Sequence, residues 1–170
     1  MSKNPIQFIY SNNGKCGSKF IRWVTRDKDQ PIADVPSHFS ILIWEWIVIE
    51  STMLYGIEPK LYAKFKDHNR IVAAFAPKAD QKSATAIAKS VAEKNRDAKY
   101  DFAAAAYMGY YELLNYYLGI DIPVKNKFDN ANEFFCNEIY RDLYGGDVSM
   151  KHPNALLNEM KNDERFIRLA

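Results

Sequence analysis

The sequence is poor in cysteine and has no long apolar run, and each absence excludes a class of protein. Two cysteines, Cys16 and Cys136, occur among 170 residues, which excludes a scaffold held together by several disulfides. No apolar run is long enough to span a bilayer. The run 6–10 near the N-terminus is too short for the core of a signal peptide. We therefore expect a soluble, cytoplasmic protein with reduced thiols.

Charge of one sign is also lacking. Lysine and arginine total 23 and aspartate and glutamate total 21, so the formal net charge is only +2. No basic block stands out, which argues against a nucleic-acid binder. The three histidines and two cysteines do not show the spacing of zinc ligands. We expect no nucleic-acid partner, no metal and no cofactor.

What the chain has in abundance is apolar sequence whose periodicity changes from strand-like to helix-like. Hydrophobic residues make up 48% of the chain, enough for the core of one domain spanning 1–170, with its core in 6–160. β-branched and aromatic runs predict strands in the first half, at 6–10, 37–43, 46–51, 61–65 and 71–75. Apolar spacing predicts helices at 18–25, from Asp80 to about 92, at 102–118, from about 132 to 143, and at 154–160.

This distribution predicts an α+β fold with a mostly antiparallel sheet packed by helices. The helix over 102–118 is apolar on nearly every side, so we expect it to be buried, and Gly119 should end it. The charged tail, 161–170, should fray.

Two residues of the predicted 37–51 hairpin could form a catalytic pair. His38 and Glu50 are an even number of positions apart, and a hairpin centred on position 44 would place them opposite each other on one face. A carboxylate bonded to an imidazole fixes its tautomer and stabilises the imidazolium. On spacing alone, two ordinary polar residues at strand ends remain the commoner explanation.

A thiol would complete a nucleophilic site. Cys136 lies early in a predicted helix, where the helix dipole would favour the thiolate, although its helical stripe with Ile139 and Leu143 equally suits a buried core residue. Cys16, just before the helix at 18–25, is a second candidate, but only 22 positions separate it from His38. We therefore rank Cys136 first.

Three other features carry weaker signals. The stretch 14–19, Gly-Lys-Cys-Gly-Ser-Lys, resembles a phosphate loop but lacks the spacing of a Walker A motif. His68 and His152 are expected in a turn and a loop. The tyrosine-rich segment 107–117 could form a protein interface, because tyrosine is favoured there.

Four segments, in order, resemble the circularly permuted NlpC/P60 group of papain-like cysteine hydrolases, the YiiX-like amidases. Ser37-His38-Phe39 after the first helix is similar to the family's "SH" strand, and Val48-Ile49-Glu50-Ser51 to its "vIEA" strand. Tyr100-Asp101 resembles its "YD". Phe135-Cys136-Asn137-Glu138-Ile139, followed by Pro153-Asn154-Ala155-Leu156, resembles its "CSELV" helix and "P-x-D-L". The departure is Asn137 in place of serine.

The resemblance implies a permuted papain-like domain with Cys136 as nucleophile, His38 as base and Glu50 as the residue that orients the base. It implies cleavage of an amide bond, with peptidoglycan stem peptides as substrate. The same triad could serve a lipid esterase or an acyltransferase. The main alternative is a non-catalytic structural or binding protein that kept the fold, such as a component of a phage particle or tail.

Overall fold

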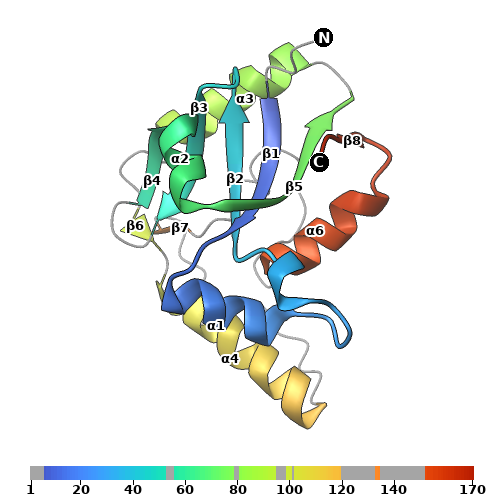
Figure 1. Cartoon of the computed structure of the whole chain (residues 1–170). Coiled ribbons are helices and arrows are strands. Elements are labelled where there is room, and N and C mark those ends of the chain that lie inside the picture. Colours follow the sequence, from blue (N-terminus) through green and yellow to red (C-terminus); the bar gives the residue numbers. More distant parts are fainter. Residues whose placement is uncertain are drawn as a thin grey trace.

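The core of the protein is a six-stranded antiparallel sheet (Figure 1). The computed structural model describes residues 6–52, 56–78, 81–94, 99–100, 102–119, 133–134 and 152–170. The order across the sheet is β4-β3-β2-β1-β5-β8. These strands are β1 (Ile6–Asn12), β2 (His38–Ile43), β3 (Ile47–Thr52), β4 (Gly56–Leu61), β5 (Arg70–Pro77) and β8 (Phe166–Arg168). The predicted α+β class with a mostly antiparallel sheet is confirmed.

Helices surround this sheet, and two further short strands form a parallel pair. In Figure 1, α1 and α4 lie together below the sheet and α6 lies beside β5 and β8. The helices are α1 (Cys16–Thr25), α2 (Tyr62–His68), α3 (Gln81–Lys94), α4 (Phe102–Leu118) and α6 (Pro153–Asn162), with a 3-10 turn η1 (Ile32–Asp34). The parallel pair is β6 (Lys99–Tyr100) and β7 (Glu133–Phe134).

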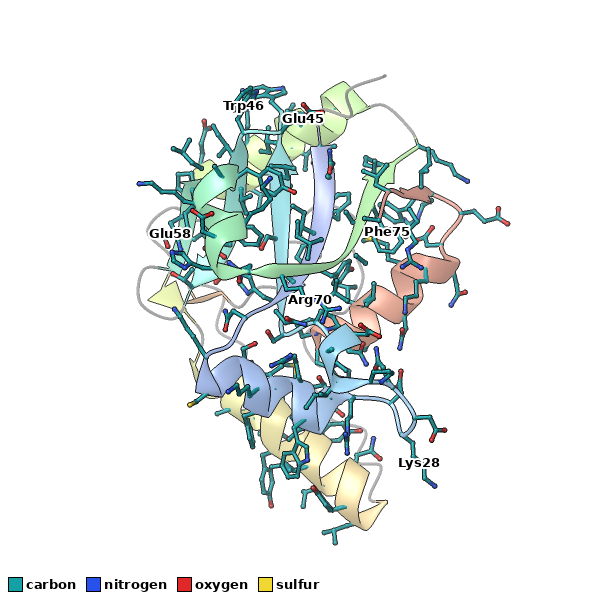
Figure 2. The ribbon with its side chains drawn as sticks, viewed as in Figure 1. Lys28, Glu45, Trp46, Glu58, Arg70 and Phe75 are labelled. Atoms are coloured by element: carbon teal, nitrogen blue, oxygen red, sulfur yellow. The ribbon has the colours of Figure 1, made fainter. Side chains whose placement is uncertain are left out.

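Both faces of the sheet are covered by side chains (Figure 2), which explains why nearly every residue of the inner strand β1 is buried. Alternate residues point to opposite faces. The larger core packs aromatic side chains of β1, β2 and β5 against residues of α3 and α6, including Phe8, Tyr10, Phe39, Phe75, Val91 and Leu156. The smaller core on the opposite face contains Ile9, Leu42, Val48 and Phe65, the last from α2.

The prediction of a strand at 61–65 is wrong. Leu61 ends β4, and the following residues form helix α2. The reason is visible in the pattern of burial: only Phe65 is buried, and its ring stacks on Tyr62 three residues earlier, a helical spacing. A run of five residues is too short for periodicity to separate strand from helix.

The expectation that α4 is buried is also wrong. Its bounds match the prediction, and Gly119 ends it with a positive φ of 62°. However, Tyr110, Tyr117 and Leu118 are 60%, 54% and 62% exposed. The helix packs along α1 at the periphery, so an apolar sequence does not here mean a central position.

The tail predicted to fray is instead part of the sheet. β8 pairs with β5, and the backbone N–H of Ala74 donates to the carbonyl of Ala170. Phe166 anchors this segment, because its ring is buried in the larger core and packs edge-on against Phe8. One buried aromatic among charged neighbours is enough to dock the tail.

The helix predicted from about residue 132 does not begin there. Glu133 and Phe134 form β7, paired in parallel with β6. The rest of that predicted helix, 135–143, lies outside the described residues, as does Asp80, the predicted first residue of an earlier helix.

Candidate active site

The β2–β3 hairpin brings His38 and Glu50 to one face of the sheet. Its register pairs Ser40 with Glu50, so the hairpin is centred on position 45 rather than on 44 as predicted. The turn explains the difference: Trp44 and Glu45 both have positive φ, at 51° and 64°, the sign required at both central positions of a type I′ turn. His38 is therefore a diagonal neighbour of Glu50.

The two side chains are hydrogen-bonded. The distance from Nε2 of His38 to Oε2 of Glu50 is 2.8 Å, and the side chains are 17% and 7% exposed. An ionised carboxylate only accepts hydrogen bonds, so it selects the form of the imidazole that carries its proton on Nε2. The predicted neighbourhood of these two residues is thus confirmed, whereas their catalytic role stays a prediction.

A third residue, Lys60 on β4, completes the cluster. Its Nζ lies 2.6 Å from Oε1 of Glu50 and 2.6 Å from Oε1 of Glu58. Both oxygens of Glu50 are therefore held by cations or donors. The sequence analysis missed Lys60 because Pro59 argues against a strand at this position. The alternation of Glu58 and Lys60 around Pro59 was the available signal, since it puts both charges on one face.

The electrostatics keep Glu50 ionised. Burial by itself would raise the pKa of this carboxyl group. The hydrogen bond and charge of His38, followed by those of Lys60, outweigh burial and lower the pKa from 4.5 to about 2. The pKa of Lys60 is raised: burial would lower it, but the two glutamates favour the ammonium form. The cluster therefore carries a permanent carboxylate beside His38 at neutral pH.

The structure describes one of the two candidate thiols. Cys136 lies outside the described residues. Cys16 is the first residue of α1 and is exposed, which agrees with the predicted position at a helix N-terminus.

A second histidine–carboxylate pair joins α4 to the start of α6. Nε2 of His152 lies 3.5 Å from Oε1 of Glu112. His152 is not a plain loop residue, as its Nδ1 accepts a hydrogen bond from the N–H of Ala155 and caps α6. Burial lowers the pKa of His152 to about 4, against the charge of Asp27, and raises the pKa of Glu112 to about 7. His68, by contrast, is exposed at the end of α2.

Within the ranges that the structure describes, no three histidine, cysteine, aspartate or glutamate side chains gather as metal ligands. No helix in the same ranges is both long and apolar enough to cross a membrane. Comparisons of the chain with protein-family models, curated proteins and solved structures find no match.

Proposed function

We propose that this chain is a cysteine hydrolase with a permuted papain-like fold that cleaves an amide bond in peptidoglycan stem peptides. The observation that carries the proposal is the 2.8 Å bond between His38 and Glu50, with Lys60 holding the second carboxylate oxygen. A buried carboxylate that stays ionised is what a catalytic imidazole needs in order to keep one tautomer and to accept a proton. The resemblance of the segment around Cys136 to the family's nucleophile helix supplies the third member.

The proposed reaction has two stages. Because Nε2 of His38 is bonded to Glu50, Nδ1 is the nitrogen that exchanges protons with the nucleophile. His38 takes the Cys136 proton, the thiolate forms a bond to the amide carbon, and the C–N bond breaks as the proton passes to the leaving amine. Water then attacks the thioester carbon while His38 takes a proton from the water, the C–S bond breaks, His38 passes that proton to sulfur, and the carboxylic acid leaves. Glu50 positions His38 throughout and takes no proton.

The first test is competitive thiol labelling with iodoacetamide. Cys136 should react faster than Cys16, and His38→Ala should slow the reaction of Cys136 by at least tenfold, because its base is lost. His68→Ala is the matched control, since this histidine is exposed at the end of α2 and has no part in the proposed triad. Slow and equal labelling of both thiols, unaffected by His38→Ala, would reject the enzyme.

The second test concerns the substrate. Purified peptidoglycan is digested with the wild type and with Cys136→Ala, and the products are analysed by mass spectrometry. New amine and carboxyl termini in stem peptides, with the wild type alone, are the expected result. Cleavage of phospholipid esters or transfer of an acyl group instead, again lost in Cys136→Ala, would keep the triad and replace the substrate.

A second candidate is a non-catalytic binding or structural protein, for example within a phage particle. The exposed aromatics of α1 and α4 favour it: the rings of Trp23 and Tyr117 lie 5.6 Å apart, and Phe20 and Tyr110 are exposed nearby in sequence. Tyrosine and tryptophan are enriched in protein interfaces. If labelling rejects the enzyme, this surface, including the tyrosine-rich segment 107–117, becomes the primary functional region.

A further inference from the structure

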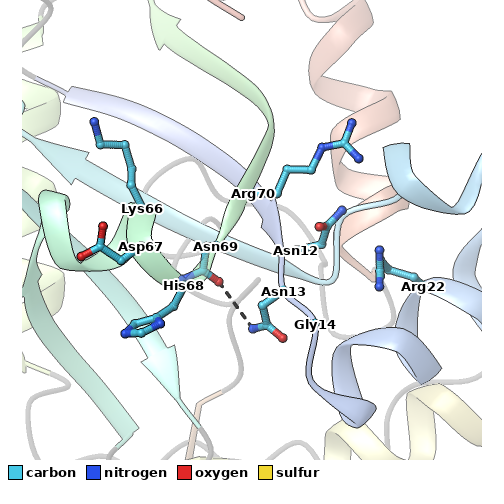
Figure 3. A pocket seen from close by; sticks show the side chains of 9 residues that line it. All are labelled: Asn12, Asn13, Gly14, Arg22, Lys66, Asp67, His68, Asn69 and Arg70. Atoms are coloured by element: carbon cyan, nitrogen blue, oxygen red, sulfur yellow. Dashed lines mark hydrogen bonds between the residues drawn. The ribbon is translucent and has the colours of Figure 1, made fainter.

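A pocket of about 470 Å³ opens at the end of β1 (Figure 3). It is lined by residues 12–14, where β1 ends before α1, by residues 66–70, which run from the last residues of α2 to the first of β5, and by Arg22 of α1. Figure 3 shows the two segments joined at the middle of the pocket, where Nδ2 of Asn13 donates to Oδ1 of Asn69 at 3.4 Å.

This pocket is close to His38 in the fold. Ser11, the residue before Asn12, pairs with His38 in the β1–β2 register. Asn12 donates to the carbonyls of Ala33 and Val35, in the segment that leads into β2. Any ligand held here would therefore lie beside the strand end that carries the His38–Glu50 pair.

The lining is positively charged. Three cations, Arg22, Lys66 and Arg70, and one carboxylate, Asp67, line it. Arg22 makes two long hydrogen bonds to backbone carbonyls, at 3.4 and 3.5 Å, and Lys66 lies over the ring of Tyr62. In the described part of the chain neither has a carboxylate partner. Arg70 contacts Asp34 at 3.3 Å in an exposed pair, which is worth little and is readily exchanged.

We propose that this pocket binds a phosphate group. Two planar guanidinium groups, from α1 and β5, suit a dianion with several oxygens better than a single carboxylate, and Lys66 adds positive charge at the opposite side of the pocket (Figure 3). At Gly14 a side chain would meet nothing within 4 Å, so a ligand can approach the backbone there. Of the stretch 14–19 that resembles a phosphate loop, only Gly14 lines the pocket, so the side chains rather than the loop supply the charge.

The test is a titration of the full chain, followed by amide chemical shifts, with inorganic phosphate and glycerol 3-phosphate as probes and acetate as the carboxylate control. We expect saturable shifts at residues 12–14 and 66–70 with both phosphates, and at least tenfold weaker binding of acetate. The double variant Arg22→Gln/Arg70→Gln should weaken phosphate binding at least tenfold. Lys28→Gln, which removes an exposed cation outside the pocket, should leave it unchanged.

Vesicles containing phosphatidylglycerol distinguish the source of the phosphate. Binding of both vesicles and glycerol 3-phosphate, each weakened by the double variant, assigns a lipid headgroup, whereas binding of the soluble phosphates alone assigns a soluble ligand. Equal binding of acetate and phosphate, or equal weakening by Lys28→Gln, would overturn the proposal. Because no step depends on Cys136, a failure of the hydrolase hypothesis leaves this test intact.

Discussion

Two histidine–carboxylate pairs within the described residues have the same chemical parts and opposite electrostatics. In the sheet, Nε2 of His38 lies 2.8 Å from Glu50, whose pKa is lowered to about 2. Between α4 and α6, Nε2 of His152 lies 3.5 Å from Glu112, whose pKa is raised to about 7. The first pair holds a charge at neutral pH, whereas burial drives the second toward its uncharged form.

The difference comes from a shorter hydrogen bond to histidine and from a third residue. His38, followed by Lys60 on the second carboxylate oxygen, more than offsets the cost of burying Glu50. For Glu112 burial is the cause of the shift, and nothing outweighs it. A histidine next to a carboxylate is therefore not by itself a sign of a catalytic base. The neighbours decide whether the pair is charged, and only the sheet pair has the charge that catalysis would use.

The largest expected effect comes from neutralising the two carboxylates in turn. Glu50→Gln leaves Lys60 and His38 without their buried charged partner and should cost about 2 kcal/mol of unfolding free energy at pH 7. Glu112→Gln, the matched control, should not destabilise the protein at this pH and should gain roughly 1–2 kcal/mol, because folding of the wild type must protonate or bury a charged carboxylate and folding of the amide need not. Urea denaturation of the three proteins checks this, and equal losses in the two variants would abolish the distinction.

The pH dependence of stability should separate the pairs next. Glu50 has a folded pKa below 4.5, so its contribution is present above pH 4.5 and is lost as the pH falls toward 2. Glu112 has a folded pKa above 4.5, so its contribution is present below pH 4.5 and is lost as the pH rises through 7. The loss for Glu112 should be roughly 1–2 kcal/mol.

Denaturation midpoints between pH 2 and pH 8 measure both losses of stability, the one at acidic pH from Glu50 and the one at higher pH from Glu112. Glu112→Gln should remove the loss of stability between pH 4.5 and pH 7 and keep the loss below pH 4.5. Glu50→Gln should remove the loss below pH 4.5 and keep the one between pH 4.5 and pH 7. His152 has the opposite pH dependence to Glu112. Because its pKa is lowered to about 4, its contribution to stability is present above pH 6.5 and is lost as the pH falls from 6.5 toward 4. A wild-type curve that matches that of Glu112→Gln above pH 4.5 would contradict the raised pKa of Glu112.

A smaller effect should show that His152 has a structural role. His152→Ala removes the acceptor for the N–H of Ala155 and should cost about 1 kcal/mol, whereas His152→Asn keeps a good cap and should cost only a few tenths. Thermal unfolding of both variants is the measurement. Equal destabilisation by alanine and asparagine would mean that the imidazole matters for something other than the cap.

The smallest effect concerns Lys60, the third residue of the sheet cluster. Lys60→Met keeps most of the aliphatic stem and removes the charge, and the expected loss is about 0.5 kcal/mol because the side chain is 38% exposed. The loss of stability at acidic pH should begin at a higher pH, because the pKa of Glu50 rises when Lys60 no longer lowers it. Lys64→Met, an exposed lysine on α2, is the control and should leave this loss unchanged.

The sequence was sufficient to predict the hairpin and the neighbourhood of His38 and Glu50. Runs of β-branched and aromatic residues predicted β2 and β3, and an even separation is all that a shared face requires. The register was wrong by one position at its centre, because it depends on the positive φ of Trp44 and Glu45, which no residue type at those positions signals.

The remaining misses have a common physical cause. Lys60 contacts Glu50 only because β4 pairs with β3, and Pro59 argued against predicting a strand there. The exposure of α4 depends on what packs against it, which an apolar sequence does not specify. The docking of the tail depends on one ring, that of Phe166. In each case the deciding contact comes from residues distant in the chain, where local periodicity carries no information.

Strand β4, which supplies Lys60, is also an edge of the six-stranded sheet. An edge strand offers unpaired backbone groups to other chains and so invites aggregation, and charged residues and proline are the usual protection. The sequence Glu58-Pro59-Lys60 provides two charged residues with a proline between them. The Lys60 ion pair that helps to keep Glu50 charged thus comes from the same short segment that makes this edge a poor template for another copy of the chain.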